Sequence, residues 1–222
     1  MKAAKSKLKI QTNNKSYSLS DSPLYKLKSK KRLEKILQNS LQELVNLSVE
    51  DGNYTVFDDA QKPGKPRKIQ KPNSKLDVVH TRIASLLSRV VTPDYLHSGK
   101  KKHSNVTNAQ AHVGSSSLLT TDVKSFFPST SRKMVFSFFY SVMQCSADVA
   151  DILAGVSTYY NQVPTGSRIS MPLAFWANIR MFNELHALSK KHSVQMTVYV
   201  DDVTFSGDQV NKLFRSPRAS TR

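Results

Sequence analysis

The stretch TVYVDDVTFSG (residues 197–207) sets two adjacent carboxylates, Asp201 and Asp202, between runs of β-branched and aromatic residues. Such runs are typical of strands, so the segment predicts a hairpin with the carboxylates at its bend. By itself this pattern is more typical of a plain turn than of a chemical site. A second apolar run, LLTTD, also ends on a carboxylate, Asp122. If the two strands are neighbours in one sheet, we expect Asp122 and Asp201 to converge.

Converging carboxylates repel one another and are costly near a core unless a cation lies between them. Asp122 and Asp201 are oxygen ligands without His or Cys close by, which favours Mg²⁺ or Mn²⁺. Two such ions roughly 3.5 to 4 Å apart can activate an attacking hydroxyl and neutralise a leaving pyrophosphate, as in polymerases.

The charge of the chain points to a phosphate-rich partner. Its 222 residues carry 33 Lys and Arg against 16 Asp and Glu, a net charge of +17. The excess is concentrated in residues 1–40 and 61–103, each with eleven basic and two acidic residues. Such blocks suit nucleic acid, because each neutralised phosphate releases counterions. A plain basic surface or an anionic membrane face is the alternative.

Hydrophobic residues make up 39% of the chain, enough for one sizeable core or two small ones. The single cysteine, Cys145, allows neither an internal disulfide nor a structural zinc site. The sequence contains no apolar run long enough to span a membrane, and its start lacks the apolar middle of a signal peptide. We therefore expect a soluble protein of the reducing cytoplasm.

The sequence pattern predicts alternating helices and strands. Residues 1–20 have little periodicity and favour a flexible basic arm. Residues 98–116 are too polar for a core and predict a surface or binding loop. The predicted helices are 22–47, 76–91, 131–143, 147–160 and 173–191, and the predicted strands are two within 53–72, one at 118–122 and the hairpin at 197–207.

Four motifs in order carry a resemblance to reverse transcriptases. TVYVDDVTFSG resembles their Tyr-x-Asp-Asp motif, and LLTTDVKSFFPS resembles the catalytic-aspartate motif before it. VPTGSRISMPLAFWAN resembles the loop and helix that support the templating base pair, and KPRKIQKP resembles the fingers strand that grips the incoming triphosphate. TNAQAHVGS is similar to the Asn-Ala-x-x-His motif of bacterial retron reverse transcriptases and related defence enzymes.

The resemblance, which covers about residues 22–207, implies a role for each matching position. Asp122 and Asp201 would be the shared metal ligands and Asp202 a weaker one, with two Mg²⁺ ions or possible Mn²⁺. Tyr199 would lie near the primer end. The residues implied for binding the deoxynucleoside triphosphate are Arg67, Lys68, Phe127, Thr165 and Gly166.

Purely structural interpretations of these residues stay open. Arg67 and Lys68 also suit a solvated basic strand, and one of Phe126 and Phe127 is expected in the core. If Phe127 lies under the sugar, it excludes a 2′-hydroxyl and deoxynucleotides are preferred. The family-motif residues Asn108 and His112 could merely cap the turn that follows them.

The resemblance implies an α+β fold: right-hand polymerase fingers over 21–104 and a palm with interleaved fingers helices over 105–210, whose antiparallel sheet is packed with helices. After the catalytic hairpin the chain ends in SPRASTR, so we expect a truncated tail over 211–222 and a missing thumb. Thr165 stands where many of these enzymes have Gln, and Met171 interrupts their Ser-Pro pair.

The implied function is copying of a structured noncoding RNA into DNA, in anti-phage defence. The partners would be that RNA as template and primer, the RNA–DNA hybrid, dNTPs and a possible effector protein, without a membrane. One alternative is an inactive, truncated fingers and palm that still binds RNA. Another is an intron-encoded (group II) or diversity-generating reverse transcriptase, which should lack the Asn108–His112 motif.

Overall fold

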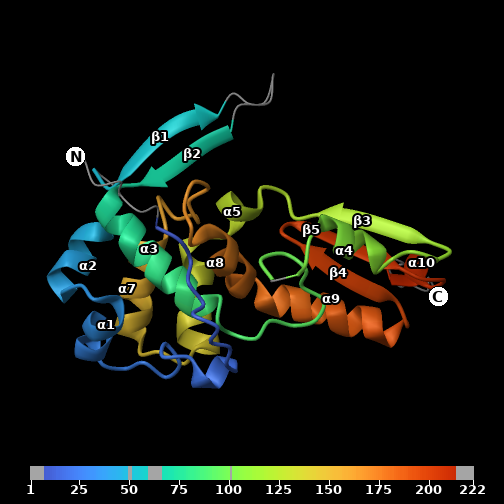
Figure 1. Cartoon of the computed structure of the whole chain (residues 1–222), viewed down its shortest axis with the longest axis horizontal. Helices are drawn as coiled ribbons and strands as arrows, with labels where there is room; N and C mark the ends of the chain where they lie inside the picture. The colour runs from blue at the N-terminus through green and yellow to red at the C-terminus, as the bar shows by residue number, and fades with distance from the viewer. Residues whose placement is uncertain (1–7, 50–51, 60–66, 101, 214–222) are drawn as a thin grey trace, which may run out of the picture. The chain divides into compact units, whose positions relative to one another are not determined.

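The computed structural model describes residues 8–49, 52–59, 67–100 and 102–213. The chain divides into two compact units, unit 1 with residues 1–91 and 127–177 and unit 2 with residues 92–126 and 178–222. Each unit is built from two separate stretches of sequence (Figure 1). Helices and antiparallel sheets occur together, which confirms the α+β class.

Unit 1 is a helical bundle with a β-hairpin. Its elements are η1 (Leu19–Asp21), α1 (Lys30–Leu37), α2 (Leu41–Leu47), β1 (Tyr54–Asp59), β2 (Arg67–Pro72), α3 (Ser74–Leu87), α6 (Arg132–Ser137), the π-helix η2 (Phe138–Val142), α7 (Ala147–Ser157) and α8 (Ser170–Ala177). α3 is buried along most of its length and packs on α1, α7 and α8. The core is aliphatic and aromatic, and its fully buried members include Leu33, Leu44, Ile83, Phe138, Phe139 and Leu153.

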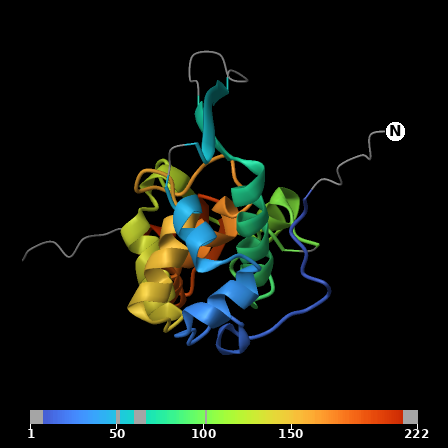
Figure 2. The ribbon, with the colours of Figure 1, turned by 90° about the vertical axis from the view of Figure 1, so that its left-hand side faces the viewer.

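The hairpin of β1 and β2 confirms the two strands predicted within 53–72. Tyr54 pairs with Pro72 and Asp59 with Arg67 in an antiparallel register. Figure 2 shows the hairpin extending beyond the end of α3. The Pro/Gly turn predicted between the strands falls at residues 60–66, outside the described residues.

The single helix predicted over residues 22–47 is wrong, because two helices form there. Ser29 caps α1, and Gln38 ends it in the left-handed conformation (φ 58°). Ser40 then begins α2 with a capping box, in which its side chain accepts from the N–H of Glu43 and the Glu43 side chain accepts in return. Capping groups thus override a continuous apolar pattern.

The apolar helix predicted over 173–191 is likewise divided, into α8 and α9 (Ile179–Lys191), because the backbone of Asn178 leaves the helical region (φ −100°, ψ 9°). The loop predicted over 98–116 contains the short helix α4 (Asn105–Gln110), which Ser104 opens with a capping box. Serine and asparagine therefore start and stop helices that hydrophobic periodicity alone does not separate.

Unit 2 is a three-stranded antiparallel sheet with helices packed on it. The strands are β3 (Leu118–Asp122), β4 (Gln195–Tyr199) and β5 (Asp202–Ser206), in the order β3-β5-β4. α4 and α9 both pack on β4 (Figure 1). α10 (Val210–Leu213) follows the sheet. The short helix α5 (Phe126–Ser129) begins with the last residue of unit 2's first stretch and continues into unit 1's second stretch.

The core of unit 2 lies between the sheet and α9. The middle residues of β4 and β5 are buried, whereas β3 is exposed along most of its length. Phe126 packs edge-on against Phe182 of α9, with ring centroids 6.2 Å apart. The buried apolar residues of this core include Leu96, Phe126, Phe182, Met196, Val198, Val203 and Phe205.

Candidate active site

The two segments that end in carboxylates are neighbouring strands, as the sequence predicts. β3 pairs with β5 so that Asp122 lies directly opposite Asp202. The N–H of Val123 donates to the carbonyl oxygen of Asp201 at 2.9 Å, which continues the pairing past the end of β3. Since opposite residues in an antiparallel pair project from the same face, Asp122 and Asp202 share one face at one end of the sheet.

Like charge is concentrated at this end of the sheet. The pKa of Asp202 is raised, first by desolvation and then by the negative charges of Asp201 and Asp122. None of the three carboxylates forms an ion pair with a described lysine or arginine. Asp122 and Asp202 are exposed and Asp201 is half-buried, so solvent and solutes reach all three.

These carboxylates fit a divalent cation in chemistry. Crowded carboxylate oxygens repel one another and are stabilised when a hard cation lies between them. Within the described residues, no group of three or more His, Cys, Asp or Glu side chains is placed so that it could hold a metal ion by itself. The donor set suits an open site, in which a bound substrate supplies the other oxygens.

The bend that carries Asp201 has an unusual backbone. Val200 adopts a left-handed conformation (φ 62°), which is unfavourable for a β-branched residue. Its N–H donates to the hydroxyl of buried Ser98 at 3.0 Å. A strained conformation of this kind persists only where the surroundings hold it. Ser98 is one of the contacts that hold the bend.

The segment before Ser98 lies along the outer edge of β4. Leu96 forms a parallel bridge with Val198, whose N–H donates to the carbonyl of Tyr95 at 2.7 Å. The carbonyl of Val198 in turn accepts from the N–H of His97 at 2.8 Å. Residues 95–97 therefore cover this edge of β4. Backbone hydrogen bonds hold the β4–β5 hairpin on both of its sides.

Tyr199 is the last residue of β4 and lies opposite Asp202 across the hairpin. It is half-buried, so part of the ring is available beside the carboxylates. Its predicted place near a primer end stays a prediction.

His112 is buried beneath the hairpin and touches both of its strands. One ring nitrogen, Nδ1, lies 2.7 Å from the hydroxyl of Ser206 on β5, and Nε2 lies 2.7 Å from the hydroxyl of Thr197 on β4. Burial, and then the charge of His97, lower the pKa of His112, which favours the neutral ring. Turn capping, the alternative interpretation of His112, is therefore wrong, because its ring nitrogens pair with the sheet.

Asn108 belongs to α4, and its side chain does not cap the turn either. The oxygen Oδ1 is buried without a hydrogen-bond partner among the described residues. Ser104, and not Asn108, supplies the cap of α4. The structure therefore gives His112 a definite place at the sheet and leaves an unused acceptor on Asn108.

Three of the predicted nucleotide-binding residues come together in unit 1. The hydroxyl of Thr165 donates toward the carbonyl of Lys68 (2.7 Å) and the side-chain oxygen of Gln70 (2.9 Å). The N–H groups of Thr165 and Gly166 bond to the side-chain and backbone oxygens of Gln70, at 3.0 and 3.2 Å. The loop after residue 163 is thus fastened to β2.

Gly166 allows this close approach. A Cβ atom at this position would lie 2.6 Å from Cγ2 of Ile69 and 2.7 Å from the carbonyl oxygen of Gln70. Both distances are too short for non-bonded atoms, so a side chain at residue 166 would displace the loop from β2. Glycine here serves backbone packing between two segments that are distant in the sequence.

The other two predicted nucleotide-binding residues lie on unit 1 with accessible side chains. Arg67 begins β2 and is exposed. Of the two phenylalanines after Asp122, Phe126 is buried in the core of unit 2, whereas Phe127 belongs to unit 1 and is half-exposed. The expectation that one of the pair is core is confirmed, and the contact of Phe127 with a sugar stays a prediction.

Several residues that hold the candidate site cannot be found from the sequence. Ser98, Gln70 and His80 act through hydrogen bonds to partners that are at least 76 residues away along the chain. Gln70 lies within the motif segment KPRKIQKP, but the resemblance gives it no role, and Ser98 and His80 are not among the motif residues. Buried polar residues of this kind have no pattern of their own, because their role depends on tertiary contacts.

Comparison with known proteins finds relatives of this chain. No family model matches the chain. The retron Se72 reverse transcriptase of Salmonella heidelberg is 28% identical over 184 residues, which are 81% of this chain and 45% of that protein. The retron Ec86 reverse transcriptase of Escherichia coli is 24% identical over 68% of this chain and 47% of its own length.

The retron Mx65 reverse transcriptase of Myxococcus xanthus is 28% identical over 73% of this chain and 42% of its own length. The chain is thus similar to bacterial retron reverse transcriptases, which confirms the resemblance that its motifs predict. It spans about half the length of the curated relatives it matches. None of the helices in the described part of the chain is long and apolar enough to cross a membrane.

Proposed function

We propose that this chain is the nucleotide- and metal-binding part of a retron-type, RNA-directed DNA polymerase. The observation that carries the proposal is the pairing of β3 with β5, which sets Asp122 opposite Asp202 and beside Asp201. The similarity to retron reverse transcriptases supports the same reaction class. The right-hand arrangement, with fingers over 21–104 and a palm over 105–210, belongs to this proposal.

In the proposed reaction, Asp122 and Asp201 would hold the divalent ions and Asp202 would assist. A bound Mg²⁺ or Mn²⁺ would supply Lewis-acid chemistry, which activates an attacking hydroxyl and neutralises charge on a leaving pyrophosphate. Tyr199, next to Asp202 in the register, would support the primer end. The hydrogen bond from Val200 to Ser98 would keep Asp201 in position before substrate binds.

Charge and shape indicate which residues would bind each part of the incoming nucleotide. Arg67 and Lys68 on β2 would bind the triphosphate, since a guanidinium pairs with two phosphate oxygens at once. Thr165 and Gly166, fastened to β2 through Gln70, would contact the same nucleotide. Phe127 would exclude a 2′-hydroxyl and so select deoxynucleotides.

The template we propose is a structured noncoding RNA, copied in anti-phage defence with a possible effector protein. The net charge of +17 supports a nucleic-acid partner, because basic residues bind the phosphate backbone. The relatives named above are all retron enzymes, which favours this type over intron-encoded or diversity-generating enzymes.

Incorporation of labelled dNTP on a primed RNA template tests the proposal. The wild-type chain should extend the primer, and Asp201→Asn should abolish extension because one metal ligand loses its charge. Glu184→Gln, a change at an exposed residue of α9, should leave extension unchanged. Equal extension by wild type and Asp201→Asn would refute it. RNA binding without extension by the wild-type chain would favour the alternative, an inactive fingers and palm that binds RNA.

A further inference from the structure

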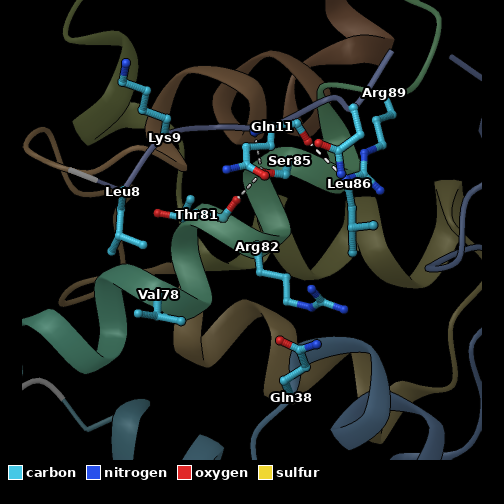
Figure 3. A pocket seen from close by; sticks show the side chains of 11 residues that line it. Leu8, Lys9, Gln11, Gln38, Val78, Thr81, Arg82, Ser85, Leu86 and Arg89 are labelled. Carbon is cyan, nitrogen blue, oxygen red and sulfur yellow. Dashed lines mark hydrogen bonds between the residues drawn. The ribbon is translucent and has the colours of Figure 1, made fainter. Parts of the chain in front are cut away.

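A cleft in unit 1 is lined by none of the predicted site residues. One wall is residues 8–13, which run across α3, and the opposite wall is α3 itself. Its volume is about 290 Å³. We call it the Arg82 cleft, and its lining residues are Leu8, Lys9, Gln11, Asn13, Gln38, Val78, Thr81, Arg82, Ser85, Leu86 and Arg89 (Figure 3).

Residues 8–17 are fastened to α3 and its neighbours at three places, so the cleft has a defined wall. The carbonyl of Leu8 accepts from Arg168 at 3.0 Å. The N–H of Gln11 donates to the hydroxyl of Ser85 at 3.0 Å. The hydroxyl of Tyr17 donates to the carbonyl of Leu86 at 2.8 Å. This part of the predicted flexible arm therefore makes specific contacts.

Two arginines, Arg82 on α3 and Arg89 just after the end of that helix, supply positive charge to the cleft. Nε of Arg82 donates to the carbonyl of Ile36, and neither Arg82 nor Arg89 pairs with a described carboxylate. Arg89 donates to the carbonyl of Gln11 at 3.0 Å, and its Nε is buried without a partner in the described part of the chain. Among the described residues, no acidic side chain lines the cleft.

The rest of the lining is mixed in character. Leu8 and Val78 are apolar side chains that remain 38% and 46% exposed. In Figure 3 they lie toward one end of the cleft and Arg89 toward the other, while the Arg82 side chain extends toward Gln38. The ammonium of Lys9 points away from Arg82 in the same view, so the two arginines carry the charge argument.

The charged, apolar and amide groups of the cleft together match one nucleotide of a single-stranded nucleic acid. A guanidinium without an acidic partner binds a phosphodiester, the exposed apolar surface accepts a base face, and the Gln38 amide can pair with a base edge. A base inside a duplex is stacked and paired, and is therefore not available to such a cleft. We propose that the Arg82 cleft binds one unpaired nucleotide of the RNA partner. This inference rests on the proposed function only for the identity of that RNA.

A charge placed in the cleft tests the inference without removing a structural contact. Val78→Glu sets a carboxylate at a half-exposed position on the cleft wall, and Val45→Glu makes the same change at a 45% exposed position on α2, outside it. Binding of fluorescently labelled single-stranded RNA is followed by anisotropy at several salt concentrations. Circular dichroism serves as the control that both variants fold.

We expect Val78→Glu to weaken single-strand binding at least tenfold more than Val45→Glu, and to reduce the salt slope by about one phosphate. Arg82→Gln should weaken it in the same direction, and binding of a blunt RNA duplex should respond equally to both glutamates. Equal loss of single-strand binding in the two glutamate variants would overturn the inference. So would a selective loss of binding to anionic lipid vesicles with RNA binding unchanged.

The two tests fail separately. If Val78→Glu binds RNA as tightly as the wild-type chain does, the cleft proposal is wrong and the polymerase proposal still stands. Conversely, primer extension unaffected by Asp201→Asn removes the polymerase proposal, while selective loss of RNA binding in Val78→Glu would still establish the cleft.

Discussion

His80 should make unit 1 sensitive to acid. The ring is completely buried in α3, with Nε2 2.6 Å from the carbonyl of Val156 and Nδ1 2.6 Å from the hydroxyl of Ser167. A carbonyl only accepts, so Nε2 carries the proton and Nδ1 accepts from Ser167. Burial lowers the pKa of His80 from 6.5 to about 4. Ser167 follows Gly166, so this histidine also helps to fix the predicted nucleotide loop.

The sign and size follow from linkage. Because the folded pKa is depressed, the stability that comes from the neutral ring is fully present above pH 6.5 and is lost as the pH falls toward 4. Since each pKa unit corresponds to a little over 1 kcal/mol, the free energy of unfolding should fall by about 2 to 3 kcal/mol between pH 7.5 and 4.5 on this account. Carboxylates and other histidines contribute to the total as well, and a variant must isolate the share of His80.

Urea unfolding followed by circular dichroism measures this share at the two pH values. His80→Asn should be less stable than wild type at pH 7.5, and its loss of stability between pH 7.5 and 4.5 should be smaller than that of wild type by about 2 to 3 kcal/mol. His192→Asn, at the end of α9, should retain the wild-type loss. Identical losses in wild type and His80→Asn would refute the reasoning.

Three further substitutions have defined outcomes. His112→Ala should lower the free energy of unfolding by about 3 kcal/mol, since two buried hydrogen bonds to Thr197 and Ser206 are lost; Val113→Ala, at an 81% exposed neighbour, should change it by less than about 0.5 kcal/mol. Gly166→Ala should cost about 1 to 3 kcal/mol in the same urea assay, because its Cβ would meet Ile69 and the Gln70 backbone. Gly155→Ala, whose nearest neighbour would be the Ser48 side chain at 3.1 Å, should cost less, and an equal cost would contradict the packing argument. Asp202→Asn should raise thermal stability in metal-free buffer at pH 7, by about 0.2 to 1 kcal/mol, since it removes repulsion from Asp201 and Asp122; a lower melting temperature would contradict this.

Much of the sheet could be predicted from the sequence. The hairpin around Asp201 and the strand ending at Asp122 carry strong strand-forming residues and stop at turn residues, so the local signal is clear. Their adjacency was a hypothesis that the chain's motifs supported and the register confirms. The rule that fails is hydrophobic periodicity across helix boundaries, where Gln38 and Asn178 interrupt apolar patterns that continue on both sides.

The supports of the site could not be predicted. His112 stood out as a motif residue, yet nothing near it in sequence indicates that it reaches Thr197 and Ser206. Ser98 is one of many serines, and its bond to Val200 depends on the path of a segment 102 residues earlier. Such contacts are set by tertiary packing, which local propensity and periodicity do not contain.

The central claim is that Asp122 and Asp201 share a divalent ion at the end of the sheet. Broadening of backbone amide signals by Mn²⁺ in an NMR titration tests it most directly, because the effect falls steeply with distance from the ion. Residues 122–124 and 200–203 should broaden together at the same Mn²⁺ concentration, and Asp122→Asn should abolish broadening in both segments. Broadening of one segment alone, or of residues 200–203 unchanged by Asp122→Asn, would contradict the account.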